Sequence, residues 1–426
     1  MQHDIRAEDH GPLGDAMAGA VGKCVHCGFC LAACPTYQEL GQETDTPRGR
    51  IVLMKEVLEG NLSLDDAQPH LDTCLGCLAC EPACPSGVPY RDLISPFRAI
   101  HETRRKRTLI DRLRRRITQS TLPYPKRFRL AAKTGGWARL FAPLVPKPFR
   151  VMLDLLPPRL PPAESWAKIH PATGTRRGRV ALLTGCAQSV LDPDINTATI
   201  DVLTRNGVEV VVPPSQVCCG ALSWHVGNQK QAAKFARQNM RAFSGEGTSG
   251  PVDAILTNAA GCGSGMHEYN LILKGTDDES SAEAFRHRVQ DVSVYLDSLG
   301  DLETFPDPGR EVVVAYHDAC HLANAQGVRR QPRVLLKKIP GVTLKEISGA
   351  DMCCGSAGTY NIDQPEIAAS LGAQKATNVM ATAAEVVASG NIGCLTQLRG
   401  HLERQASPIR VRHTMQILRD AYAGRL

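Results

Sequence analysis

The pattern of hydrophobic positions differs between the two halves of the chain. In the N-terminal half, Arg50–Glu59 carries apolar residues at helical spacing and is followed by Gly60, a stop signal. In the C-terminal half, short runs of β-branched residues predict strands at Val180–Thr184, Val208–Val212 and Val312–Tyr316. Helical patterns lie between and after them, over Gln229–Phe243 and Pro365–Ala381. We therefore expect an α+β multidomain protein, in which a helical N-terminal domain is followed by α/β units with motifs at strand ends.

Two internal repeats divide the chain further. The first run of cysteines (Cys24, Cys27, Cys30 and Cys34) recurs 50 residues later as a second run (Cys74, Cys77, Cys80 and Cys84). A different pattern, one cysteine, then Cys-Cys-Gly, then one more, also occurs twice, at offsets of 132 to 135 residues. Its members are Cys186, Cys218, Cys219 and Cys262, and then Cys320, Cys353, Cys354 and Cys394. Matched positions at a nearly constant offset predict a duplicated domain.

These patterns give four expected segments. They are a two-cluster ferredoxin-type domain (1–100), a basic, proline-rich linker (101–175), a first Cys-Cys-Gly domain (176–305, the first repeat) and a second (306–426, the second repeat).

The linker is unusually basic. Residues 101–160 hold 16 Lys and Arg against three acidic residues, a local charge of +13. We expect a solvated helix face over Arg104–Arg116 and a chain wrapping over a surface from Leu122 to Pro171, where ten prolines occur. Such a segment can dock an acidic flavoprotein surface or anionic lipid, or be no more than a solvated linker. Nucleic acid is not expected, because no binding motif accompanies the charge.

Composition narrows the class of protein. The 426 residues are 43% hydrophobic and 22% charged, as in globular proteins, and no apolar stretch reaches 18 residues. The first residues lack the apolar core of a signal peptide, so we expect a cytoplasmic protein. Sixteen cysteines in such a chain favour metal ligation over disulfides, because cytosolic thiols are kept reduced.

Both cysteine runs have the form C-x2-C-x2-C-x3-C-P. Three thiolates at this spacing reach three irons of a cubane, while the fourth ligates the partner cluster. We therefore assign one [4Fe–4S] cluster to Cys24, Cys27, Cys30 and Cys84, and the other to Cys74, Cys77, Cys80 and Cys34. The alternatives are two zinc sites or redox-active C-x2-C pairs, and neither explains the duplication of the whole run. His26, inside the first run, is either a residue that tunes the cluster or an exposed loop histidine.

The cysteines of the two Cys-Cys-Gly repeats supply four thiolates each. They are candidates for a further cluster or redox site in each repeat, or else buried apolar cysteines that pack a duplicated core. Four histidines lie near them: His225, His267, His317 and His321. His317 and His321 flank Cys320 four residues apart, either as a ligand pair on one helix or as histidines without a functional role.

Motifs for organic cofactors are missing. No G-x-G-x-x-G opens a strand–helix unit and no phosphate-binding loop is present, so we expect no flavin, nicotinamide or ATP site and no catalytic residue on this chain. A cubane carries one electron, whereas oxidation of an organic substrate delivers two. A flavin on a partner chain is the simplest way to split the pair, which makes this chain an electron-transfer subunit.

The order of the motifs resembles the iron–sulfur subunit of bacterial glycolate oxidase. The resemblance runs from Cys24 to the C-terminus and is carried by Cys-Val-His-Cys-Gly-Phe-Cys (24–30), Cys-Pro-Thr-Tyr (34–37), Pro-Arg-Gly-Arg-Ile (47–51), Cys-Pro-Ser-Gly-Val (84–88), Gly-Cys-Ala-Gln (185–188), Cys-Cys-Gly-Ala (218–221), Cys-Cys-Gly-Ser-Ala-Gly-Thr-Tyr (353–360) and Asn-Ile-Gly-Cys (391–394).

This resemblance implies a complex with FAD-containing subunits that oxidise glycolate to glyoxylate, while this chain passes electrons toward an acceptor such as membrane quinone. It also implies two [4Fe–4S] clusters on the eight N-terminal cysteines and a position in the cytoplasm or on the inner face of the membrane. The alternatives are the corresponding subunit of a lactate or glycerol-3-phosphate dehydrogenase complex, a catalytic subunit like heterodisulfide reductase, and a scaffold with structural zinc. Cys262 and Cys394 each lack the Cys-x-x-Cys ending of heterodisulfide reductases, which counts against the catalytic alternative.

Overall fold

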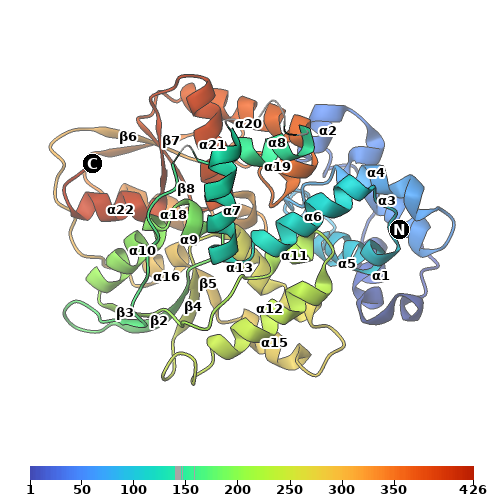
Figure 1. The fold of residues 1–426 in the computed structure, drawn as a ribbon, viewed down its shortest axis with the longest axis horizontal. Helices are drawn as coiled ribbons and strands as arrows, with labels where there is room; N and C mark the ends of the chain where they lie inside the picture. The colour runs from blue at the N-terminus through green and yellow to red at the C-terminus, as the bar shows by residue number, and fades with distance from the viewer. Residues whose placement is uncertain (140–144, 146, 158) are drawn as a thin grey trace.

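The computed structural model describes residues 1–139, 145, 147–157 and 159–426. The remaining residues (140–144, 146 and 158) belong to the predicted linker and lie outside the described part. Figure 1 shows the N-terminal helices on one side of the molecule and the two sheets on the other. None of the helices in the described part is long and apolar enough to cross a membrane.

The N-terminal region is helical, as predicted, and no strand occurs in its first 104 residues. Its elements are η1 (Ala7–Leu13), α1 (Gly14–Gly22), α2 (Pro35–Leu40), η2 (Glu43–Asp45), α3 (Pro47–Leu58), α4 (Leu64–Asp72), α5 (Arg91–His101) and η3 (Glu102–Arg104). The two cysteine runs lie in the loops before α2 and α5. Pro47 begins α3, and the Thr46 hydroxyl accepts a hydrogen bond from the Gly49 N–H, which fixes the start of this helix.

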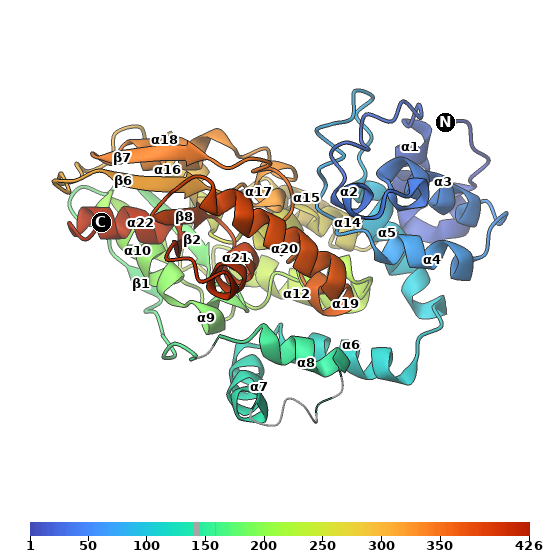
Figure 2. The same ribbon diagram turned by 90° about the horizontal axis from the view of Figure 1, so that it is seen from above.

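The expected linker contains three helices: α6 (Leu109–Thr121), α7 (Pro125–Ala138) and α8 (Lys147–Asp154). They form a separate layer along one side of the molecule (Figure 2). The helix expected from Arg104 begins at Leu109, because the Thr108 hydroxyl accepts a hydrogen bond from the Asp111 N–H and caps it there.

The two repeats have the same sheet topology, which confirms the predicted duplication. In the first, β2 (Gly178–Leu183), β3 (Val208–Val211), β4 (Ala254–Thr257) and β5 (Val289–Asp291) are parallel in the order β3-β2-β4-β5, and the short β1 (Ile169–His170) pairs antiparallel with β3. In the second, β6 (Val312–Tyr316), β7 (Val342–Glu346), β8 (Val386–Ser389) and β9 (Arg410–His413) are parallel in the order β7-β6-β8-β9.

Helices connect these strands as a parallel sheet requires. Those of the first repeat are α9 (Gln188–Leu191), α10 (Asp194–Arg205), α11 (Ala221–His225), α12 (Gln229–Ala242), α13 (Ala260–His267), α14 (Tyr269–Ile272), α15 (Glu279–Arg286) and α16 (Val292–Ser298). Those of the second are α17 (Cys320–Ala323), α18 (Arg330–Lys337), α19 (Tyr360–Asp363), α20 (Pro365–Met380), α21 (Ile392–Arg404) and α22 (Thr414–Tyr422).

One hydrophobic core joins the two repeats. It includes Val180, Leu182 and Leu256 of the first sheet together with Val314 and Val386 of the second. Helices α10 and α22 cross this junction, where the Arg419 guanidinium donates to the Asp194 carboxylate at 3.0 Å. The repeats are therefore packed as one body.

Candidate functional site

The first cysteine run lies at the surface, with Cys84 beside it. Cys84 and Cys24 lie close enough to Cys30 for their charges to act on its thiol, whose pKa burial raises to about 11. A small cavity of about 30 Å³ is lined by Cys24, Cys27, Cys30 and Cys84, together with Cys80. Cys27 itself is exposed. The structure thus brings together the four residues predicted to hold one cluster.

In the second run, Cys74 and Cys80 are buried and Cys77 is partly exposed, and the residue of the first run that lies with them is the buried Cys34. Burial raises the pKa of Cys80 well above its ordinary value, and the nearby Cys77, Cys74 and Cys34 add to the shift. The Gly76 N–H donates to the Cys74 sulfur at 3.4 Å, so the backbone of this loop already faces sulfur. The four residues predicted for the other cluster are therefore neighbours as well.

Arg50 is a buried cation beside the second run, and only 1% of it is exposed. Its guanidinium lies 3.9 Å from the Cys34 sulfur and 3.5 Å from the Asp45 carboxylate, and it donates to the Thr73 hydroxyl at 2.7 Å. Burial would raise the pKa of the Cys74 thiol, but the guanidinium groups of Arg50 and Arg98 hold it below its ordinary value. This environment favours the thiolate, which is the form that ligates metal.

Sequence reasoning did not single out Arg50 or Arg98. The only signal for Arg50 was its place in the Pro-Arg-Gly-Arg-Ile stretch that carries the resemblance.

The cysteines of each repeat follow the carboxyl ends of three adjacent strands. In the first repeat, Cys186 follows β2, the Cys218–Cys219 pair follows β3, and Cys262 lies in α13 after β4. Because parallel strands end at the same edge of the sheet, the loops bring these residues together. The sulfur atoms of Cys186 and Cys218 are 3.3 Å apart, and the adjacent thiols of Cys218 and Cys262 lower the pKa of Cys219 well below its ordinary value.

The second repeat gathers its cysteines in the same way. The sulfur atoms of Cys320 and Cys353 are 3.9 Å apart, and the neighbouring thiols of Cys353 and Cys394 lower the pKa of Cys354. Asn391 donates to the Cys394 sulfur at 3.4 Å. All four cysteines of this repeat are buried, whereas Cys186 and Cys262 of the first are partly exposed.

Glycine follows each cysteine pair for a steric reason. Gly220 and Gly355 both have positive φ, of 87° and 84°. A Cβ at Gly355 would lie 2.6 Å from the Ala368 carbonyl oxygen, and one at Gly220 would lie 3.3 Å from that of Ala232. Glycine therefore lets each cysteine-bearing loop approach the helix that follows it.

Both sets of cysteines line one cavity of about 760 Å³ between the repeats. Its lining also includes Cys74 and Leu75 of the second run, and side chains of α6, α7 and α8. Five arginines contribute to it: Arg98, Arg105, Arg107, Arg114 and Arg115. The basic segment therefore helps to enclose the cysteine cavity.

The second run packs directly against the second repeat. The Tyr360 hydroxyl donates to the Thr73 carbonyl oxygen at 2.7 Å. The Asn324 side-chain amide donates to the Cys77 carbonyl oxygen at 3.2 Å. The His321 ring nitrogen lies 3.1 Å from the Gly76 carbonyl oxygen. These contacts hold the loop of the second run against α17 and α19.

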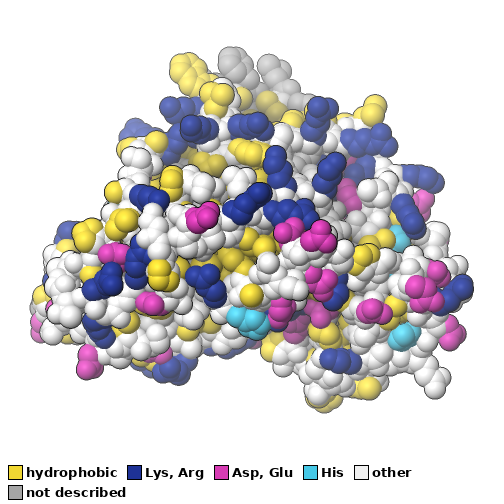
Figure 3. Space-filling model, turned by 90° about the horizontal axis from the view of Figure 1, so that it is seen from below, with side chains coloured by type: hydrophobic (Ala, Val, Ile, Leu, Met, Phe, Trp, Pro, Cys, Tyr) yellow, Lys and Arg dark blue, Asp and Glu magenta, His cyan; other side chains and the backbone are white. Residues whose placement is uncertain are grey.

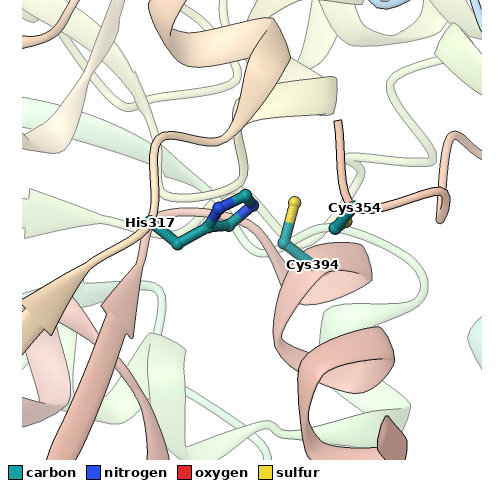
Figure 4. Close-up of side chains that lie close together, drawn as sticks. All are labelled: His317, Cys354 and Cys394. Atoms are coloured by element: carbon teal, nitrogen blue, oxygen red, sulfur yellow. The ribbon is translucent and has the colours of Figure 1, made fainter. Parts of the chain in front are cut away.

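The predicted helical pair of His317 and His321 is wrong. α17 begins only at Cys320, so His317 lies in the loop after β6 and the two residues share no helix. His321 instead stacks edge-on with His225, with ring centroids 5.2 Å apart. His317 lies with Cys354 and Cys394, and a ring nitrogen and the two sulfur atoms are all within 4.8 Å of one another (Figure 4). Of the other two candidate histidines, His26 is exposed and His267 is partly buried.

The residues fit iron–sulfur ligation. All sixteen cysteines are free, and they gather in groups of four in which each thiol has other thiols as neighbours. Thiols gathered this closely can ligate one cluster together, because the positive charge of its irons offsets the burial and mutual repulsion that oppose their ionisation.

Comparison with known proteins gives the same picture. The family model described as a 4Fe-4S dicluster domain matches residues 20–88, and the one described as a cysteine-rich domain matches residues 180–267 and 314–399.

Three relatives represent the curated proteins that are similar to the chain. It is 37% identical to the probable glycolate oxidase iron-sulfur subunit of Bacillus subtilis, over 95% of this chain and 94% of that protein. It is 38% identical to the glycolate oxidase iron-sulfur subunit of Escherichia coli, over 93% of each chain. A lactate utilization protein A of Oceanobacillus iheyensis is 32% identical, over 58% of this chain and 98% of its own length.

Proposed function

The chain belongs to the family of glycolate oxidase iron–sulfur subunits, and we propose that it is the electron-transfer subunit of a complex that oxidises glycolate to glyoxylate. In this proposal FAD-containing partner subunits carry out the substrate chemistry, and this chain passes their electrons toward an acceptor such as membrane quinone. The observation that carries the proposal is the convergence of the two N-terminal cysteine runs into two groups of four thiols, one nearer the surface and the other mostly buried.

The residues of the chain have distinct roles in this function. Cys24, Cys27, Cys30 and Cys84 would hold one [4Fe–4S] cluster, and Cys74, Cys77, Cys80 and Cys34 the other. When bound, such clusters accept and release one electron at a time. Arg50 and Arg98 offset the negative charge of the buried site, while contacts with Tyr360 and Asn324 hold the loop of the second run in place. Exposed Cys27 marks the side that a partner can approach.

The cysteines of the two repeats are the residues for further iron–sulfur centres. Their closeness within each repeat, and their shared cavity beside Cys74, support such centres rather than a purely structural role.

The test compares the chain alone with the chain joined to its flavoprotein partners. We expect anaerobically prepared protein to hold at least eight irons and to give a paramagnetic signal on reduction. It should not reduce a dye with glycolate until the flavoproteins are added. Glycolate-dependent dye reduction by the isolated chain would overturn the division of labour, and bound zinc with no iron chromophore would favour the scaffold alternative.

A catalytic role of the repeats, like that of a disulfide reductase, is a second candidate, because both sets of cysteines face one cavity of about 760 Å³. Cys219→Ser and Cys354→Ser separate the two: the catalytic candidate predicts lost turnover of a disulfide substrate with the N-terminal clusters intact.

The outer face of α6 and α7 supports docking to an anionic membrane surface. Five large hydrophobic side chains are exposed there: Leu109, Ile110, Leu113, Leu130 and Trp137. Among the described residues, Arg112, Arg116, Lys126 and Lys133 of these helices have no ion-pair partner. Figure 3 shows Lys and Arg side chains gathered with hydrophobic ones along the upper part of the face it draws. Apolar anchors among unpaired cations are typical of helices that lie on anionic lipid.

Vesicle sedimentation tests this docking. We expect the full chain to sediment with phosphatidylglycerol-containing vesicles and not with pure phosphatidylcholine. Arg112→Glu combined with Arg116→Glu should abolish binding, whereas the matched pair Lys337→Glu and Lys345→Glu, on α18 and β7 at the opposite side in Figure 2, should not. Unchanged binding of the first variant would contradict the proposal.

A further inference from the structure

His317 is a buried histidine whose ring faces sulfur. None of its surface is exposed, and it is the one histidine among the described residues whose two ring nitrogens are both buried without a nitrogen or oxygen partner, while its ring acts on the Cys354 thiol. Its backbone N–H donates to the Ala388 carbonyl oxygen at 2.9 Å, which continues the pairing of β6 with β8 and fixes where the side chain begins. Buried polar groups in folded proteins are nearly always satisfied, so this imidazole requires a partner.

The imidazole points at two of the second repeat's cysteines. Figure 4 shows the His317 ring and the side chains of Cys354 and Cys394 directed toward one another from three different loops or helices. All three residues are buried, and their ligand atoms lie within 4.8 Å of one another. Imidazole nitrogen and thiolate are both established ligands of iron in iron–sulfur centres.

The first repeat lacks this nitrogen. His317 stands three residues before Cys320, and the residue three before Cys186 is Leu183, at the end of β2. Leu183 is 1% exposed and packs in an apolar cluster with Cys218 and Cys219.

A second difference lies on the helices that follow the cysteine pairs. Ala232 and Ala368 are equivalent, because their carbonyl oxygens are what a Cβ at Gly220 or Gly355 would meet. Seven residues further on, the first repeat has Asn239 and the second has Lys375. The Asn239 amide donates to the Cys218 carbonyl oxygen at 2.9 Å. Lys375 places an ammonium group, only 2% exposed, against the Gly349 carbonyl oxygen.

We propose that His317 is a nitrogen ligand of an iron–sulfur centre held by the cysteines of the second repeat, and that the corresponding centre of the first repeat has thiolate ligands only. This inference rests on the further centres proposed above. In this assignment the neutral His317 imidazole replaces one of the four thiolates of the second repeat as a ligand. Together with the Lys375 cation nearby, this lowers the negative charge around the iron. The second-repeat centre therefore has the more positive reduction potential of the two.

Spectroscopy on the full, cluster-loaded chain tests the assignment. In the reduced wild-type protein we expect a paramagnetic signal with strong nitrogen-14 coupling that disappears in Cys394→Ser, which assigns it to the second repeat. His317→Leu, which introduces the residue of the first repeat, should abolish the coupling. His317→Cys should retain the iron, lose the coupling and titrate at a lower potential. The control His225→Ala, at a partly buried histidine that also lines the cavity, should change neither coupling nor potential.

The outcomes separate this inference from the proposed function. If His317→Leu and His317→Cys keep the coupling and the potential of the signal that Cys394→Ser removes, His317 is not a ligand, although the further centre stands. If the wild-type protein has eight irons, all on the N-terminal cysteines, both the further centre and the histidine ligation fail, while electron transfer by the N-terminal clusters remains. Unchanged N-terminal signals in every variant show that the chain has folded.

Discussion

The two cysteine runs share one sequence pattern but lie in opposite surroundings. The loop of the first run is at the surface, where Val25 and Phe29 are 64% and 67% exposed. The second run is enclosed between Arg50 and the second repeat. Spacing alone therefore sets which thiols can share a cluster, whereas the surrounding residues set how strongly the site is stabilised and which molecules can reach it.

A single helix contributes to both environments. On α3, Arg48 donates to the His26 carbonyl oxygen at 3.0 Å and pairs with Glu43 at the surface. Two residues later, the Arg50 guanidinium lies 3.9 Å from the Cys34 sulfur and donates to the Thr73 hydroxyl, beside the second run. Substitutions of equivalent residues at the two runs therefore test how far the surroundings of each run determine its stability and redox behaviour.

The largest effect is expected from removing one thiol of each run. Cys74→Ser should lose the iron of the buried site and lower the free energy of unfolding by about 5 kcal/mol or more, because a buried, metal-stabilised loop loses its support. Cys27→Ser, at the exposed run, should lose iron with a much smaller loss of stability. Iron analysis and urea unfolding under anaerobic conditions measure both, and equal losses of stability would show that the surroundings do not matter.

Arg50→Met should cost about 3–5 kcal/mol, since it leaves the Asp45 carboxylate buried without its charged partner. It should also make the reduction potential of the second-run cluster more negative, because a cation that stabilises the added electron is gone. Arg48→Met, at the partly exposed pair with Glu43, should cost at most about 1 kcal/mol. Urea unfolding and a redox titration of each variant are the measurements. If Arg48→Met shifted the reduction potential of the second-run cluster and Arg50→Met did not, Arg50 would not be the cation that stabilises the added electron.

His101, on the helix that follows the second run, should make stability depend on pH. Burial lowers its pKa to about 4, from an ordinary value of 6.5. The unfolded chain then binds more protons than the folded one between these values, so stability falls as pH falls through this window, by about 2 kcal/mol from pH 7 to pH 5.

His101→Phe should remove that loss while keeping the ring contact with Phe97. If His101→Phe lost as much stability between pH 7 and pH 5 as the wild type does, His101 would not be the cause of that pH dependence.

The smallest effect is expected from the contact between the second run and the second repeat. Tyr360→Phe removes the hydroxyl that donates to Thr73 and should cost about 1 kcal/mol. Hydrogen exchange should become faster at the amides of residues 73–77, and the loop of the first run serves as an internal control. Equal changes in both loops would mean that Tyr360 acts on the whole domain.

Local sequence signals predicted much of this fold. The β-branched runs became β2, β3 and β6 within a residue or two, and α12 and α20 end one residue before the predicted limit. These elements are well predicted because their periodicity depends only on which face is buried. The linker was harder to predict, since one of its prolines, Pro125, begins a helix instead of breaking one.

The site was predicted only in part, for a physical reason. Cysteine spacing indicated which thiols group together, because three thiolates at this spacing reach three irons of one cubane while the fourth ligates the partner cluster. Arg50 and His317 act through contacts with residues far away in the sequence, such as Thr73 and Cys394. His317 was misassigned because a spacing of four residues was interpreted as helical across the end of a strand.

The merged interior of the two repeats has a mechanical consequence. Because Val180 and Leu256 share one apolar core with Val314 and Val386, neither sheet can tilt without opening that core to water. The sulfur atoms at the two sheet edges are thus carried by one packed body, and any change in the distance between the two sets of cysteines has to disturb that shared core.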